Sequence, residues 1–260
     1  MILLFEFLGT MLLASLWNSC FVSGGGSYFS FVAGDMTGFL CGFFVLLIFS
    51  ARISGSHFNP AITLAFMFRR DIGRFSRLLG ILYIAAQYVG AILGTQISYN
   101  IFGANVDNYP PCAVMKGGDY MNKSLIIQAI ILEILGAMLL TFLYLTQTEE
   151  KTKLSGDPAI TTMIISATYT CLFGYSMTSG VTTGTPYNPA VALGEWWAVL
   201  FAGNYSTGHG FNFWVSMFFS YAGSLLAVVL FEFVYKPAIS TAEEVADLDS
   251  EDEEDKLIQN

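Results

Sequence analysis

Long apolar segments alternate with short polar ones along the chain. Six of the apolar segments are about 20 residues long, the length that lets a helix cross the hydrocarbon core of a bilayer. The pattern therefore predicts an all-α membrane protein with six transmembrane helices. The predicted spans are Ile2–Val22, Met36–Ile53, Leu78–Ile101, Leu125–Thr146, Ala159–Met177 and Phe213–Tyr235.

Two shorter apolar segments each begin with the triplet Asn-Pro-Ala. They cover residues 59–68 and 188–201. Because Asn caps helices well and Pro is tolerated at the first helical position, each triplet predicts the start of a helix. Helices this short cross only about half of a bilayer, so we expect two re-entrant half-helices. The residues predicted at the membrane midplane are Asn59, Pro60, Ala61, Asn188, Pro189 and Ala190.

The two halves of the sequence resemble each other. Glu6 and Gly9 in the first span match Glu133 and Gly136 in the fourth, and an Asn-Pro-Ala triplet follows in each half. Because three spans separate the copies, the second half enters from the opposite face, as an inverted repeat. We predict a first half-repeat over residues 1–118 and a second over residues 119–240. Their half-helices then approach each other N-terminus to N-terminus.

The composition agrees with a membrane protein, because 54% of residues are hydrophobic and only 12% are charged. The net charge of −9 is concentrated near the end of the sequence, where nine acidic residues lie between Glu243 and Asp255. We therefore predict that residues 241–260 form a solvated, disordered acidic tail on the cytoplasmic side. This local acidity gives no indication of a nucleic-acid partner.

Basic residues gather on one predicted side of the membrane, which the positive-inside rule makes cytoplasmic together with both termini. No basic stretch or cleavage signal accompanies Met1, so the first span is predicted to be retained. The glycosylation sequons at Asn122 and Asn204 then face outward. The basic residues of the cytoplasmic side are Arg52, Arg69, Arg70, Arg74, Arg77, Lys151, Lys153 and Lys236.

The four cysteines show no spacing typical of a metal site, and we predict neither a metal nor a cofactor. Cys41 and Cys171 lie in apolar runs and are predicted to be buried. Cys20 and Cys112 fall on the same outer side, and the sequence leaves open whether they form a disulfide.

The two asparagines and the helix N-termini beside them determine the chemistry of the predicted midplane. A helix N-terminus carries about half a positive charge, so two N-termini aimed at one point would repel cations and protons. The side-chain amides of Asn59 and Asn188 would offer N–H groups to a passing oxygen. A water held by both amides could not relay a proton along a file. The alternative is that both asparagines are only helix caps.

The sequence resembles the aquaporin (major intrinsic protein) family over about residues 1–236. The resemblance rests on both Asn-Pro-Ala triplets, on Glu6 and Glu133, on Gln87 within Ala86-Gln87-x-x-Gly90-Ala91, and on Phe213-Trp214-Val215. It implies a passive channel for water in a homotetramer with one pore per subunit. It also implies that Glu6, Glu133, His57 and Gln87 hold the re-entrant loops by hydrogen bonds. The alternatives are a transported-proton site at the glutamates and a pH gate at His57.

Alignment with the family places the narrowest part of the pore at Phe39, Ser176, Thr185 and Val191. The family usually has Arg where Val191 stands, and water channels have His where Ser176 stands. The small side chains predict a wider opening that also admits glycerol, urea or ammonia. Against this, Ala192 and Phe213-Trp214 resemble the water-selective branch. Ser216-Met217 and Ser220 depart from a usual Gly-Pro and Gly, which affects only the expected bend of the sixth span.

Two other functions fit parts of the pattern. A membrane junction or scaffold protein could keep the same fold and conduct little. An intramembrane enzyme is not expected, because His57 and His209 are the only histidines and no nucleophile–base pair falls on facing spans. We therefore predict a channel for water and small neutral solutes, embedded in the lipid bilayer.

Overall fold

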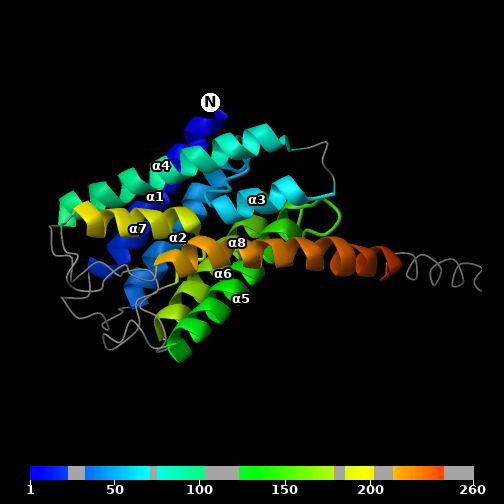
Figure 1. Cartoon of the computed structure of the whole chain (residues 1–260). Helices are drawn as coiled ribbons and strands as arrows, with labels where there is room; N and C mark the ends of the chain where they lie inside the picture. Colours follow the sequence, from blue (N-terminus) through cyan, green and yellow to red (C-terminus); the bar gives the residue numbers. More distant parts are fainter. Residues whose placement is uncertain (23–32, 71–74, 103–122, 179–184, 202–212, 243–260) are drawn as a thin grey trace, which may run out of the picture.

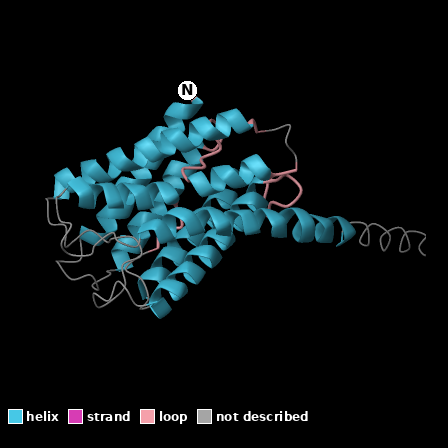
Figure 2. Ribbon diagram, viewed as in Figure 1, coloured by secondary structure: helices cyan, strands magenta, loops and turns pink. Residues whose placement is uncertain are grey.

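The computed structural model of the chain describes residues 1–22, 33–70, 75–102, 123–178, 185–201 and 213–242, and these residues are almost entirely helical (Figures 1 and 2). The sequons at Asn122 and Asn204, the cysteine Cys112 that the sequence leaves as a partner for Cys20, and the tail from residue 243 lie outside this part. In chain order the helices are α1 (Ile2–Val22), α2 (Ala33–Ser50), α3 (Pro60–Phe68), α4 (Arg77–Phe102), α5 (Lys123–Thr148), α6 (Pro158–Thr178), α7 (Pro189–Phe201) and α8 (Phe213–Leu230), which a π-helical turn, η3 (Phe231–Tyr235), extends.

The six predicted spans form α1, α2, α4, α5, α6 and α8, and the two short segments form α3 and α7. Among the described residues, four helical stretches are long and apolar enough to cross a membrane: Ile2–Ser19, Arg77–Ile101, Lys123–Thr148 and Phe213–Ala242. The apolar part of α2, Met36–Ser50, is shorter. Helix α6 has 21 residues, of which seven are Ser or Thr.

Several threonine side chains of α6 are hydrogen-bonded within the helix itself. The hydroxyl of Thr162 donates to the carbonyl of Pro158 at 2.7 Å, and the hydroxyls of Thr168 and Thr170 donate to carbonyls four residues earlier at 2.8 Å. A hydroxyl bonded in this way hides its polarity from an apolar surrounding. Helix α6 can therefore lie in a membrane despite its lower hydropathy.

Two helix pairs, α1 with α4 and α5 with α8, make the most extensive contacts in the molecule and occupy matching places in the two halves. Glycine makes both approaches close. A Cβ added to Gly94 of α4 would lie 2.1 Å from the carbonyl oxygen of Met11 in α1, and one added to Gly223 of α8 would lie 2.3 Å from that of Ile134 in α5. Small residues at such crossings are typical of helices that pack within lipid.

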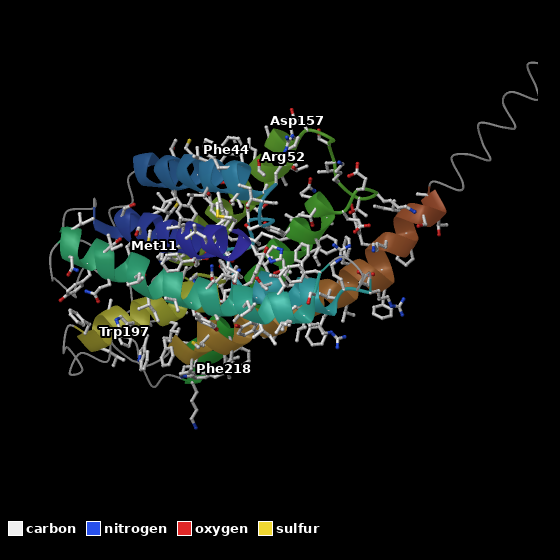
Figure 3. All side chains as sticks on the ribbon, turned by 90° about the horizontal axis from the view of Figure 1, so that it is seen from above. Met11, Phe44, Arg52, Asp157, Trp197 and Phe218 are labelled. Atoms are coloured by element: carbon white, nitrogen blue, oxygen red, sulfur yellow. The ribbon has the colours of Figure 1, made fainter. Side chains whose placement is uncertain are left out.

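The outward-facing side chains are largely apolar, which suits contact with lipid (Figure 3). Phe218 of α8 is 65% exposed and Trp197 of α7 is also exposed. The prediction that Cys41 and Cys171 are buried is wrong, because both are exposed. An apolar run in a membrane helix has no inward preference of its own, since lipid is as apolar as the protein interior.

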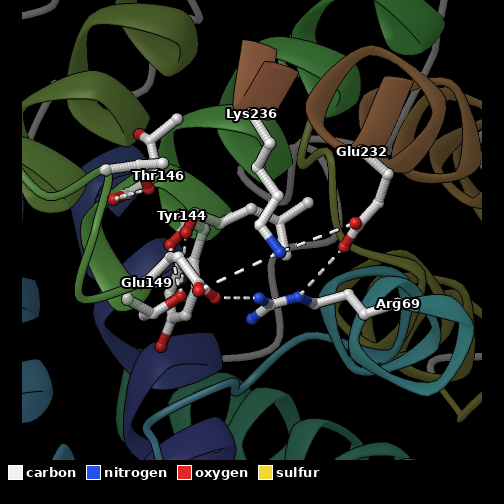
Figure 4. A network of polar contacts seen from close by, with 9 residues as sticks. Arg69, Tyr144, Thr146, Glu149, Glu232 and Lys236 are labelled. Atoms are coloured by element: carbon white, nitrogen blue, oxygen red, sulfur yellow. Dashed lines mark hydrogen bonds and ion pairs between the residues drawn. The ribbon is translucent and has the colours of Figure 1, made fainter. Parts of the chain in front are cut away.

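A cluster of four charged side chains joins the end of α3 to α5 and η3 (Figure 4). Arg69, which follows α3, pairs with Glu149, and its Nε lies 3.6 Å from Glu232 of η3. The ammonium of Lys236 lies 3.9 Å from Glu149 and 3.6 Å from Glu232. Arg69 also packs over the ring of Phe231 at 5.4 Å. Two cations and two anions thus balance in a largely buried place.

Replacing Arg69 by Met is expected to lower the free energy of unfolding by about 2 kcal/mol, because two buried carboxylates would then share a single cation. Denaturant titration of the purified protein would measure the loss. The control is Lys153→Met, which breaks the pair with the exposed Glu150 and should cost less than about 1 kcal/mol. Equal losses for the two variants would show that the cluster does not stabilise the fold.

Candidate functional site

The half-helices α3 and α7 lie end to end in the middle of the bundle (Figure 1). The Oδ1 of Asn59 accepts from the backbone N–H of Ala61 at 2.9 Å, and the Oδ1 of Asn188 accepts from that of Ala190 at 3.0 Å. Both asparagines therefore cap their helices through a side-chain oxygen. Pro60 and Pro189 occupy the first helical positions, where a missing N–H removes no hydrogen bond.

The same two amides connect the half-helices to each other. The Nδ2 of Asn59 donates to the carbonyl oxygen of Tyr187 at 2.8 Å, and the Nδ2 of Asn188 donates to that of Phe58 at 2.9 Å. Each amide uses one of its two N–H groups in this way. The exchange is reciprocal, as a two-fold axis between the halves requires.

The carbonyls that accept these bonds belong to residues with an uncommon backbone. Phe58 has φ of 48° and Tyr187 has φ of 49°, in the left-handed region that bulky residues rarely adopt. Their rings pack against Gly9 and Gly136, where an added Cβ would lie 2.0 Å and 2.1 Å from the nearest ring atom. Both loops thus hold the same strained turn, and each turn is seated on a matching glycine.

The carboxylate of Glu6, fully buried in α1, holds the first loop. It accepts from the backbone N–H of His57 at 3.1 Å, from that of Phe58 at 2.9 Å, and from the side-chain amide of Gln87 at 2.8 Å. The Gln87 amide also donates to the hydroxyl of Thr63 in α3 at 2.9 Å. These bonds pair N–H groups of the loop that would otherwise lack partners in an apolar bundle, and they hold the loop in place.

Glu133 of α5 occupies the matching place in the second half but has different partners. It accepts from the hydroxyl of Ser216 at 3.1 Å and from the hydroxyl of Ser220, both in α8, and from the backbone of Tyr187. In the sequence these serines stand out only as departures from the family pattern. The spacing of four residues, which places both hydroxyls on one helix face, is the signal that could have revealed them.

His57 lies on the first loop with its ring buried among aromatic side chains. Its Nδ1 is 3.2 Å from the hydroxyl of Thr63, and its ring stacks on Phe66 with centroids 4.4 Å apart. The rings of Tyr83 and Tyr144 lie 5.5 Å and 6.1 Å away. These contacts place His57 in the packing of the loop.

The four residues aligned with the narrowest part of the pore are all fully buried. Phe39 and Val191 belong to one core cluster, and the backbone N–H of Thr185 donates to the hydroxyl of Ser176 at 3.0 Å. The wider opening predicted from the small side chains of Ser176 and Val191 stays a prediction, because burial of these residues does not measure the width of a path between them.

Aromatic rings that sequence analysis missed fill the space beside Phe39. The ring of Phe173 lies 5.3 Å from that of Phe39 and 3.9 Å from that of Trp17, measured between centroids. All three side chains are fully buried. Phe173 precedes Ser176 by three residues on α6, so it shares a helix face with a residue already assigned to the narrowest part. That spacing could have identified it.

Fold and site together define a class of protein: an all-helical integral membrane protein, built as an inverted repeat, with two half-helices that meet at their capped N-termini. The comparison of sequences gives the family. Residues 2–231 match the major intrinsic protein family, and the chain belongs to it.

Its relatives include several aquaporins. The chain is 31% identical to mouse Aquaporin-1 over 189 residues, which are 73% of this chain and 62% of that protein. It is 29% identical to human Aquaporin-5 over 195 residues, which are 75% of this chain and 66% of that protein. The chain thus spans just under two thirds of the length of the relatives it matches.

The fold is similar to that in the X-ray structure of the aquaglyceroporin from Plasmodium falciparum. The TM-score is 0.72 with 22% sequence identity, and the similarity covers 92% of this chain and 98% of that one. At this identity the comparison bears on the fold alone.

Proposed function

We propose that the chain is a passive transmembrane channel for water that also passes small uncharged solutes such as glycerol, urea or ammonia. The observation that carries the proposal is the reciprocal bonding of Asn59 and Asn188 across the two loops. It holds both amides at the meeting point of two helix N-termini, and each amide has a second N–H for a passing oxygen. The named relatives are aquaporins, which supports the same function.

Proton exclusion follows from the same geometry. The N-termini of α3 and α7 each contribute about half a positive charge at one place, which opposes the entry of a hydrated proton. A water that accepts from both amides directs both lone pairs toward them, so it cannot accept a proton from the next water. The Arg that the family usually has at position 191 is absent, so we assign the exclusion of cations to the helix ends.

Reconstitution into liposomes tests the channel. After an osmotic jump, vesicles that contain the protein should shrink several times faster than empty vesicles, as followed by light scattering. Equal rates would contradict the proposal.

The fully buried constriction favours a second candidate, a membrane junction or scaffold protein with little conductance. For that candidate, vesicles that contain the protein should shrink no faster than empty vesicles and should adhere to one another in an ordered way.

We infer the topology and assembly from the sequence and the family. Both termini lie in the cytoplasm because the basic residues gather on their side. The family resemblance favours a homotetramer in which each subunit has its own pore.

Replacing Phe173 by Leu is expected to raise the permeability to glycerol severalfold and the permeability to water by less, because a smaller side chain would widen the space beside Phe39. Swelling assays with a panel of solutes would measure the ratio. The matched control is Phe218→Leu, at an exposed position on α8, which should leave the ratio unchanged. An unchanged ratio in the Phe173 variant would place the narrowest part elsewhere.

A further inference from the structure

A buried carboxyl in α7 is not used by the proposed channel mechanism. Glu195 is 1% exposed, and neither of its side-chain oxygens has a hydrogen-bond partner. It lies four residues after Val191 and therefore on the same face of the helix, one turn nearer its C-terminal end. In the described part of the chain no Lys or Arg pairs with it.

The side chain next to this carboxyl also has an acceptor oxygen without a hydrogen-bond partner. The side chain of Asn18, in α1, neighbours Glu195 and is 2% exposed. Its Nδ2 donates to the carbonyl of Ala14 at 2.8 Å and reaches the hydroxyl of Thr95 in α4 at 3.5 Å. These bonds fix the orientation of the amide, and its Oδ1 has no partner.

Close packing brings the three helices together at this place. A Cβ added to Gly194 would lie 2.7 Å from the Thr95 hydroxyl and 2.9 Å from the carbonyl of Ala91, so α7 lies directly against α4. The Glu195 and Asn18 side chains thus supply three acceptor oxygens without a hydrogen bond of good geometry, at the junction of α1, α4 and α7. The Asn18 amide lies near the carboxyl, but its Nδ2 bonds to Ala14 and Thr95.

A buried acceptor oxygen lowers the stability of the fold unless it accepts a hydrogen bond or contacts a positive charge. Oxygen ligands of this kind suit hard cations, and a single carboxylate balances a single positive charge. We propose that Glu195 and Asn18, next to the hydroxyl of Thr95, form a binding site for a small monovalent cation, an alkali ion or ammonium. The site lies one helical turn from Val191, so a bound ion would place a positive charge close to a position that has none of its own.

Thermal unfolding of the whole purified protein in detergent tests this site without any measurement of flux. We would compare the chlorides of sodium, potassium and ammonium with N-methyl-D-glucamine chloride at equal ionic strength. At least one small cation should raise Tm by a few degrees in a saturable way, because a ligand that binds only the folded state stabilises it. The series also separates alkali ions from ammonium.

Glu195→Gln, which keeps the shape of the side chain and removes its charge, should abolish the rise. The matched control, Glu150→Gln, changes an exposed carboxylate and should keep the rise intact. Asn18→Ala retains the carboxylate and should require a higher concentration for half-saturation, which keeps the test valid if Glu195→Gln fails to fold. If the carboxyl is instead protonated and solvated by water, the wild type would show no ion-specific rise in Tm. That result would overturn the proposal. An equal rise in Glu195→Gln, or an unchanged half-saturation in Asn18→Ala, would also overturn it.

Discussion

Glu6→Gln is expected to abolish most of the water permeability and to lower the free energy of unfolding by about 3 kcal/mol. The carboxylate of Glu6 accepts three N–H groups, from His57, Phe58 and Gln87. A glutamine at this position has one acceptor oxygen and one NH2 group, so at least one donor would face another donor in a fully buried place. The first loop would then lose the support that holds the turn at Phe58.

Two measurements separate the two effects. Denaturant titration gives the change in stability, and osmotic shrinkage of liposomes, normalised to folded protein, gives the permeability. Glu150→Gln makes the same chemical change at an exposed side chain and should alter neither quantity. Wild-type stability in Glu6→Gln would show that the loop does not depend on this carboxylate.

A comparably large effect is expected from Gly94→Ala, which should also destabilise the protein by about 3 kcal/mol, at the upper end of the cost of overpacking. The added Cβ would lie 2.1 Å from the carbonyl oxygen and 3.0 Å from the Cα of Met11. Because these are backbone atoms of α1, no rotation of a side chain can relieve the clash. The helices α1 and α4 would have to move apart along one of the most extensive contacts in the molecule.

Gly38→Ala provides the control, because it makes the same substitution in another long helix, α2. A Cβ there meets nothing within 4 Å. Alanine has a higher helix propensity than glycine, so this variant should be as stable as the wild type or more stable, by up to about 1 kcal/mol. Equal unfolding midpoints for the two variants would show that the contact between α1 and α4 tolerates a methyl group.

The sequence predicts the fold well because each helix has a local signal. Hydrophobic length alone predicts the long helices to within a few residues at most ends, since a chain in lipid must satisfy its own backbone. The two Asn-Pro-Ala triplets predict the starts of α3 and α7 because capping depends on adjacent residues.

Features that depend on contacts between distant segments are harder to predict. The spacing from Ser176 places Phe173 on the relevant face of α6, but its contact with Trp17 depends on how α1 and α6 pack. The spacing of Ser216 and Ser220 likewise indicates a polar helix face, but it does not identify their partner, Glu133, which lies on another helix. The exposure of Cys41 and Cys171 follows from helix rotation, which an apolar sequence in an apolar solvent does not determine.

The exchange of hydrogen bonds between the two loops has a consequence for biosynthesis. Asn59 and its acceptor, the carbonyl of Tyr187, are 128 residues apart in the sequence. At a translation rate of 5–20 residues per second, the ribosome takes roughly 6 to 26 seconds to deliver the partner. Until then the first loop lies in the membrane without the acceptor for its Asn59 amide. The first half of the chain can therefore reach its final conformation only after the second half has been inserted.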